Sequence, residues 1–398
     1  MKGILFSPSL LSFFFTLVSS SPLPLPIVTE RAKGSGNSTY ANSVNECPTL
    51  PPRASPATTV HDLRPDDFSY TLALGDSITA GAFSRGFQTN PFLSLSEWRG
   101  QSYAAGMDNG AITIPNFIKH YNPSATGGSR GSNIFPEICF GFICLPGSLG
   151  WNSAVDQLNA AQTGALASNL PHEVDDYLIP QVKKRNLPIN KFKYINLQIG
   201  SNDLCWLCGQ AALEIGPGSA DDFEKNIRYT LERLRKEIPN SVVNLLAVFK
   251  VSDIFELTLN QPYCSKLLPS IPHKNLECAC SLLGGHIGET TRALMDELTD
   301  QYNERLVKIA TEYQKKKYPD FAVVWQPEVV HLGTYPIQAL SDVDCFHPSL
   351  ASHELLATSI WNRLVGTAEE KEAPVTWTTA PQVRCLQPGD RIRTDTLL

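Results

Sequence analysis

Ser77 stands at the end of a short apolar run, where its hydroxyl group could act as a nucleophile. Residues 70–74 read Tyr-Thr-Leu-Ala-Leu, a pattern typical of a strand, and Gly75 ends the run. Reactive side chains of open α/β sheets collect where a strand passes into the following loop. Taken alone, however, the Gly-Asp-Ser triplet favours a simpler interpretation, in which Ser77 caps the next helix.

A carboxylate and an imidazole near the other end of the chain could supply the partners that such a serine needs. Asp344 and His347 are three residues apart in a loop, and Pro348 can open the helix that follows. A serine hydroxyl needs a base that takes its proton, and the base needs a carboxylate that fixes its tautomer. We therefore predict that His347 is the base and that Asp344 orients it.

An amide completes the set. Asn202 follows a second apolar run at residues 194–197 (Tyr-Ile-Asn-Leu), so it is expected on the same rim as Ser77. An asparagine amide at such a place can donate a hydrogen bond to the oxyanion that forms when a carbonyl carbon is attacked. The three sites together predict acyl transfer.

The elements between these sites alternate between strand and helix patterns. Strands are predicted at residues 70–74, 192–199, 242–249 and 321–325, and helices at residues 172–186, 219–238, 289–317 and 350–364. The long Gly- and Asn-rich stretch up to residue 149 is predicted to form loops that face the substrate. This order predicts an α/β fold with a central parallel sheet and helices on both faces. The carboxyl edge of that sheet would bring the serine, the amide and the histidine together.

Three blocks of the chain, taken in order, resemble the motifs of the GDSL, or SGNH, hydrolase family. They are Gly-Asp-Ser at 75–77, Gly-Ser-Asn-Asp at 200–203 and Asp-Val-Asp-Cys-Phe-His up to residue 347, which carries the Asp-x-x-His pattern. The likeness extends to the phospholipase B branch of the family and covers roughly residues 47–385. The segments that carry this further likeness are 61–67, 98–103, 114–118 and 203–208.

The resemblance implies a three-layer, flavodoxin-like hydrolase fold and a serine ester hydrolase with catalytic Ser77, Asp344 and His347. Its second block, residues 158–164, implies that the Gly164 N–H joins Asn202 and the Ser77 N–H in binding the oxyanion. Lipid acyl esters, with phospholipid or lysophospholipid first, are the implied substrates. The alternatives are a carbohydrate or short-chain carboxylesterase, and a catalytically silent binding protein of the same fold. The implied chemistry needs no metal and no cofactor.

Composition limits the partners and the compartment. With 398 residues, a net charge of −6 and a pI near 5.8, the chain offers no basic face for nucleic acid. Residues 1–20 read as a secretory signal peptide, and residues 21–60 as a flexible lead-in that carries a glycosylation acceptor at Asn37. We expect a hydrolase domain at 61–367, a polar tail at 368–398 and a secreted, extracellular product. The apolar loop at 135–151 is expected either to contact a lipid, at a membrane or micelle surface, or to serve as a disulfide-pinned structural loop.

Ten cysteines in an exported chain predict disulfides. Local spacing favours Cys139 with Cys144 and Cys205 with Cys208, whereas Cys47 and Cys385 bracket the domain and would tie the tail back. No pairing is favoured for Cys264, Cys278, Cys280 and Cys345. Two less favoured alternatives are a redox pair at Cys205 and Cys208, and a zinc site built from His273, Cys278, Cys280 and His286.

Two further polar residues are assigned structural positions. Asp76 is expected to hold the turn at Ser77 by hydrogen bonds. His353, inside the closing helix and without a nearby aspartate in the sequence, is expected on the surface of that helix.

Overall fold

Four parallel strands form the central sheet. They are β2 (Phe68–Gly75), β7 (Phe192–Gln198), β8 (Ser241–Leu246) and β9 (Phe321–Gln326), and they lie side by side in the order β2-β7-β8-β9. Across the sheet, Leu74 pairs with Leu197, Leu197 with Leu245, and Leu245 with Trp325. Every residue of β8 and β9 is buried, because a parallel sheet is covered on both faces.

The computed structural model describes residues 39–134, 150–206, 218–265, 283–327 and 330–398, with short pieces at 139–140, 143–144, 278 and 281. The predicted signal peptide, the glycosylation acceptor Asn37 and most of the apolar loop at 135–151 lie outside these residues, so they stay predictions. Within the described residues, no helix is both long enough and apolar enough to cross a bilayer.

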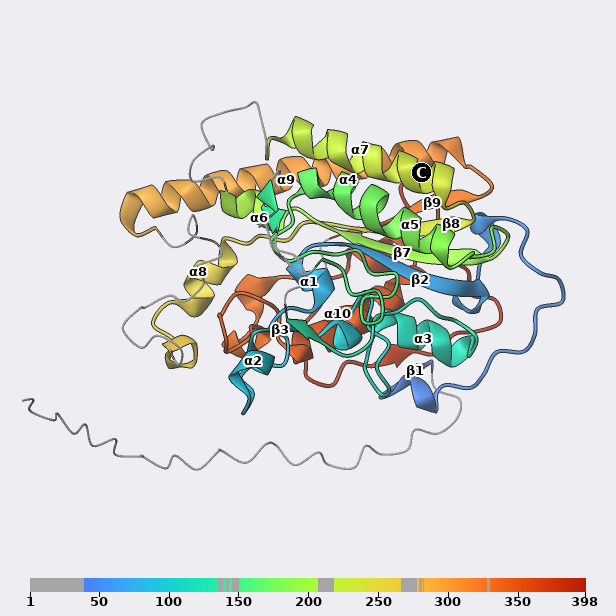
Figure 1. Ribbon diagram of the computed structural model, residues 1–398, viewed down its shortest axis with the longest axis horizontal. Helices are drawn as coiled ribbons and strands as arrows, with labels where there is room; N and C mark the ends of the chain where they lie inside the picture. Colours follow the sequence, from blue (N-terminus) through green and yellow to red (C-terminus); the bar gives the residue numbers. More distant parts are fainter. Residues whose placement is uncertain are drawn as a thin grey trace, which may run out of the picture. The chain divides into compact units, whose positions relative to one another are not determined.

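Helices cover both faces of the sheet (Figure 1). One layer holds α4 (Leu170–His172), α5 (Ile179–Lys184), α7 (Ala220–Glu237) and α9 (Gly285–Lys316), and the other holds α3 (Ile114–Tyr121) and α10 (Leu350–Leu364). Apolar side chains of α7 recur at three- and four-residue steps, and Phe223, Ile227, Leu231 and Leu234 are all fully buried. The predicted three-layer α/β fold is confirmed.

The outer edge of β2 is occupied by irregular chain. Thr71 N–H donates to Thr126 O at 2.9 Å, Ala73 N–H donates to Leu158 O at 3.1 Å, and Ala160 N–H donates to the Ala73 carbonyl at 2.8 Å. The bridges at Thr126 and Asn159 run parallel to β2. These segments take the place of a strand beside β2, so β2 becomes an inner strand, as in a flavodoxin-like sheet order.

The remaining elements are short. The helices are α1 (Ser77–Ala80), α2 (Pro91–Ser94), α6 (Ser201–Cys205), α8 (Asp253–Thr258) and α11 (Ala368–Glu372), and the two-residue strands are β1 (Tyr40–Ala41), β3 (Ser96–Glu97), β4 (Asn133–Ile134), β5 (Cys139–Phe140), β6 (Ile143–Cys144) and β10 (Val383–Arg384).

The predicted helices at 219–238, 289–317 and 350–364 correspond to α7, α9 and α10. The predicted helix at 172–186 contains a π-helical stretch, Glu173–Leu178, between α4 and α5. Pro180 follows this stretch and has no N–H to continue a regular ladder. In contrast, α3 was missed, because the Gly- and Asn-rich stretch around it reads as loop. Thr113 caps this helix by accepting from Asn116 N–H.

One predicted disulfide is confirmed and another is wrong. Cys47 bonds to Cys385, and β1 pairs with β10 beside it, so the C-terminal segment is tied back as expected. Cys205 bonds to Cys278 rather than to Cys208. This bond also contradicts a redox pair at Cys205 and a zinc site that uses Cys278.

The other cysteines are described only in part. The backbones of Cys139 and Cys144 face each other across β5 and β6, while their side chains lie outside the description. Cys345 is disulfide-bonded, Cys208 and Cys280 lie outside the described residues, and Cys264 is described in its backbone alone.

Candidate active site

A tight turn at the end of β2 presents Ser77. Asp76 caps α1, its Oδ1 accepting from Ile78 N–H at 2.9 Å, so Asp76 rather than Ser77 is the capping residue. Gly75 has φ +147°, and a Cβ there would lie 2.2 Å from Gln198 O on the neighbouring strand. Only glycine fits this close approach, and it places Ser77 at the first position of α1.

The structure brings Ser77, His347 and Asp344 into one hydrogen-bonded chain. His347 Nε2 lies 2.7 Å from Ser77 Oγ, and His347 Nδ1 is hydrogen-bonded to Asp344 Oδ2. Asp344 Oδ1 also accepts from the backbone N–H of Phe346 at 3.0 Å and from that of His347 at 3.2 Å. With the carboxylate hydrogen-bonded to Nδ1, Nε2 faces the serine hydroxyl and can accept its proton, so the arrangement can turn the hydroxyl into a nucleophile.

The loop that carries His347 is held from two sides. Ser341 N–H donates to His347 O at 2.8 Å, and Ser341 Oγ donates to Phe83 O at 2.7 Å. The Phe83 ring packs edge-on against the imidazole, with 5.1 Å between ring centroids. The imidazole is 2% exposed, so its orientation is set by packing as well as by Asp344.

Asn202 lies beside the turn that contains Gly164. The Asn202 side-chain amide donates to Ala165 O at 2.9 Å, and Gly164 has φ +81°. An amide nitrogen carries two N–H groups, and this bond uses one of them. The carboxylate of Asp203 holds the same turn, accepting from Ala167 N–H at 3.0 Å. Because Gly75 pairs with Gln198, the turn at Ser77 and the start of α6 follow neighbouring strand ends.

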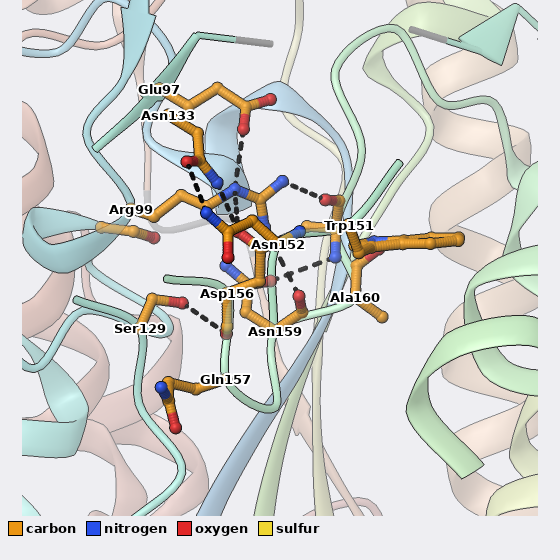
Figure 2. A network of polar contacts seen from close by, with 12 residues as sticks. Glu97, Arg99, Ser129, Asn133, Trp151, Asn152, Asp156, Gln157, Asn159 and Ala160 are labelled. Atoms are coloured by element: carbon orange, nitrogen blue, oxygen red, sulfur yellow. Dashed lines mark hydrogen bonds and ion pairs between the residues drawn. The ribbon is translucent and has the colours of Figure 1, made fainter. Parts of the chain in front are cut away.

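A fully buried arginine holds the segment that leads to Gly164 (Figure 2). Arg99 Nε donates to Glu97 Oε2 at 2.7 Å and lies 3.2 Å from Asp156 Oδ1, and none of the three side chains is exposed. Arg99 also donates to the backbone carbonyls of Asn159 at 3.4 Å and Ala161 at 2.7 Å. The ion pairs therefore fix the path of the backbone just before Gly164.

The network reaches further along the same segment. Glu97 Oε1 accepts from Thr163 Oγ1 at 2.5 Å, next to Gly164. Asp156 accepts from Asn133 Nδ2 at 2.9 Å and from Asn152 N–H at 2.6 Å. Sequence reasoning missed this cluster, because no short pattern links Glu97 and Arg99 to a residue as distant as Asp156.

His353 is not on the surface of its helix, and that prediction is wrong. The side chain is fully buried, and Nδ1 accepts from Tyr103 N–H at 3.2 Å. Burial, together with the nearby His347, lowers the pKa of His353 to about 3, so the ring is neutral. The segment around Tyr103 covers this side of α10, which the helix pattern alone does not reveal.

Three buried carboxyl groups, those of Asp76, Glu173 and Asp203, accept backbone N–H groups close to Ser77 and Asn202. Glu173 Oε2 accepts from Gly75 N–H at 2.9 Å. Burial raises the pKa of Asp76 to about 6 and that of Asp203 to about 7, and it raises the pKa of Glu173 well above its usual range. Each of these groups accepts backbone N–H groups, so they shape the two turns that carry Ser77 and Asn202.

The raised pKa of Asp203 predicts a pH-dependent effect of Asp203→Asn. Between the unfolded pKa of 3.8 and the folded pKa of about 7, the unfolded chain has lost a proton that the folded chain keeps. Rising pH therefore destabilises the folded wild type over this window, and the asparagine variant lacks this loss. We expect the free energy of unfolding of Asp203→Asn, relative to wild type, to rise by up to about 4 kcal/mol between pH 4 and pH 8. Urea unfolding at both pH values measures it; a constant difference would contradict the assignment.

Comparison with known proteins identifies a family that matches most of this chain. A model of the GDSL-like lipase/acylhydrolase family matches residues 72–360. Membrane-associated phospholipase B1 of Rattus norvegicus is 29% identical over 332 residues, which are 80% of this chain and 21% of the relative. The Homo sapiens protein is 28% identical over 338 residues, which are 82% of this chain and 21% of the relative. The chain thus spans about a fifth of the length of these relatives.

Two solved structures are more distant. An extracellular lipase from Streptomyces rimosus has 13% identity and a TM-score of 0.32, covering 72% of this chain and 94% of that one. A variant of an acetyl xylan esterase from Geobacillus stearothermophilus has 16% identity and a TM-score of 0.38, covering 78% of this chain and 97% of that one.

Proposed function

The chain belongs to the GDSL-like lipase/acylhydrolase family of carboxylic ester hydrolases, and we propose that it is a secreted enzyme that cleaves lipid acyl esters through an acyl-enzyme on Ser77. The observation that carries this proposal is the hydrogen-bonded chain from Ser77 through His347 to Asp344. The similarity to phospholipase B1 supports phospholipids and lysophospholipids as the preferred esters.

In the proposed reaction, Ser77 Oγ attacks the acyl carbonyl carbon while His347 Nε2 takes the hydroxyl proton. His347 then gives this proton to the leaving alcohol, and water hydrolyses the acyl-enzyme by the same steps in reverse. Asp344 keeps the imidazole in the useful tautomer. The oxyanion is held by the N–H groups of Ser77 and Gly164 and by the amide of Asn202, each contributing about 3 kcal/mol to the lowering of the barrier.

The direct chain neighbours of the reacting residues face apolar surroundings. Ile78, Phe346 and Pro348 line a small cavity of about 30 Å³ together with Phe249 and Leu340. This space is about the size of one or two water molecules, so the choice of a lipid ester rests on the similarity to phospholipase B1. Secretion is supported by the disulfides Cys47–Cys385 and Cys205–Cys278, because such bonds persist in oxidising compartments.

Mass spectrometry of the products from a mixed-chain phosphatidylcholine tests the proposal. The full chain, secreted from a host that forms disulfides, is expected to release free fatty acid, and the chain released identifies the ester position that is cut. An acetylated xylan oligomer serves as the parallel substrate. Acetate release without any fatty acid release would contradict a lipid ester hydrolase and favour the carbohydrate esterase.

A further inference from the structure

Five large apolar side chains stand in solvent on the segment that follows Ser77 and on the strand that pairs with β3. Phe92 is 70% exposed, Ile134 55% and Leu95 45%, and Phe87 and Leu93 are each more than a third exposed. We call these five residues the apolar rim. Single exposed apolar residues are ordinary, but several together on connected elements mark a surface that has a partner.

The first part of the rim is attached to the loop of the catalytic histidine. Phe87 N–H donates to Asp342 Oδ1 at 2.9 Å, two residues before Asp344. Four residues earlier, the Phe83 ring packs against the His347 imidazole. Phe87 therefore follows a segment that contacts the triad directly.

The second part of the rim is attached to the same segment through β3. Phe83 N–H donates to Ser96 O at 3.0 Å, and Ser96 Oγ donates to Phe92 O in α2 at 3.0 Å. Ile134 of β4 lies opposite Ser96 in the β3–β4 pair. Figure 1 shows α2 at the end of the sheet at which α1 begins. The rim thus spans two connected elements at the edge that carries Ser77.

The charges around the rim suit a phospholipid surface. From Ser77 to Ser96 the sequence contains no acidic residue, and Arg85 is its one charged residue, although the whole chain carries −6. Arg85 is exposed, and its guanidinium lies over the Trp98 ring. Asp342 is the acidic residue that the contacts place at the rim, where its Oδ1 accepts from Phe87 N–H. One basic and one acidic residue give the rim no net negative charge, so it can enter the boundary between phosphate groups and acyl chains without strong repulsion.

We propose that the apolar rim inserts into the surface of a phospholipid layer and holds Ser77 and His347 next to the esters there. This proposal rests on the proposed function, since a lipid ester hydrolase must reach a carbonyl group that lies at this depth. Burial of one Phe or Leu side chain shifts partition by about tenfold or more, so the loss of Phe92 and Leu93 together should weaken the attachment measurably.

Sedimentation with phosphatidylcholine vesicles tests the attachment without catalysis. All proteins carry Ser77→Ala, so that the vesicles stay intact. We expect Phe92→Ser/Leu93→Ser to lower the partition coefficient at least about tenfold. Ile189→Ser is the matched control. Ile189 is also 70% exposed, but it precedes β7 and so lies at the amino end of the strands, whereas Ser77 follows a carboxyl end. This control should bind as the parent does. Because the rim is apolar, the parent should still bind in 1 M NaCl.

Activity separates a failure of this inference from a failure of the proposed function. In the Ser77 background, Phe92→Ser/Leu93→Ser should lower the ratio of the rate on vesicles to the rate on a water-soluble butyrate ester at least tenfold, and Ile189→Ser should not change it. Absence of any esterase activity in wild type would contradict the proposed function alone. Vesicle binding that is absent from the parent, equal in Phe92→Ser/Leu93→Ser, equally lost in Ile189→Ser, or abolished by salt would overturn the role of the rim.

Discussion

Ser77→Ala and His347→Ala are each expected to lower kcat by about 10⁴-fold or more. Without the hydroxyl there is no nucleophile, and without the imidazole the hydroxyl keeps its proton. Because the two groups act as one unit through their 2.7 Å contact, the double variant should lose little more than either single variant. The measurements are kcat on a water-soluble ester and covalent labelling of Ser77 by a fluorophosphonate, which both single variants should fail to show.

The same substitutions should leave the fold nearly unchanged. Ser77→Ala removes one buried hydrogen bond, which costs about 1 kcal/mol. Ser84→Ala is the matched control, since Ser84 is equally buried and its hydroxyl donates to Gly81 O at 3.1 Å. We expect Ser84→Ala to change Tm about as much as Ser77→Ala does and to keep full turnover. If Ser77→Ala lowered Tm far more than Ser84→Ala does, its loss of turnover would reflect loss of the fold. Ser77 would then be a core residue and not the nucleophile.

Asn202→Ala extends this series and should give an intermediate loss. One missing oxyanion donor costs about 10²- to 10³-fold in kcat, with the proton transfer itself intact. The variant should still be labelled at Ser77, only more slowly. An Asn202→Ala variant with wild-type kcat would leave the oxyanion to the two backbone N–H groups.

Features that depend on local pattern were predictable from the sequence. The apolar steps of α7 and its cap at Ser219 are local, and so are the apolar runs that become β2 and β7. Because parallel strands end at one edge, the sequence also implied that Ser77 and His347 meet, although 270 positions separate them. The role of each residue in catalysis stays a prediction.

Features that depend on long-range packing were not predictable in this way. The helix pattern alone indicates a surface position for His353, but in the folded protein the segment around Tyr103 covers this side chain. Cys205 is separated by 73 positions from its partner Cys278, whereas spacing favoured its near neighbour Cys208. The cost of closing a loop grows only slowly with its length, so proximity in the sequence is a weak guide to disulfide pairing.

Arg99→Met is expected to lower the free energy of unfolding by about 3–5 kcal/mol. Arg99 forms ion pairs with the buried carboxylates of Glu97 and Asp156 (Figure 2), and its removal leaves both carboxylates in the interior without this cation. Burial already raises the pKa of Asp156 to about 6, with Arg99 acting in the opposite direction, so the site tolerates charge poorly. Urea unfolding at pH 7.5 measures the loss.

Arg305→Met is the matched control, because Arg305 also pairs with two carboxylates, Asp221 at 2.8 Å and Glu224 at 3.0 Å, but its side chain is 36% exposed. Its removal should cost less than about 1 kcal/mol, since water and salt screen an exposed pair. Equal losses from the two methionine variants would show that burial of the Arg99 cluster carries no special cost.

Arg99→Met should also lower catalysis, because the Arg99 cluster holds the segment that leads to Gly164. Arg99 and Glu97 bind the backbone and side chains of residues 159–163, which lead directly to Gly164. At a temperature where Arg99→Met is folded, kcat should therefore fall while KM changes little, because a displaced oxyanion donor acts on the transition state. Adding Asp156→Asn removes one unpaired charge and should restore part of the stability. It should restore little of kcat, because the contacts of Arg99 to residues 159 and 161 are still missing.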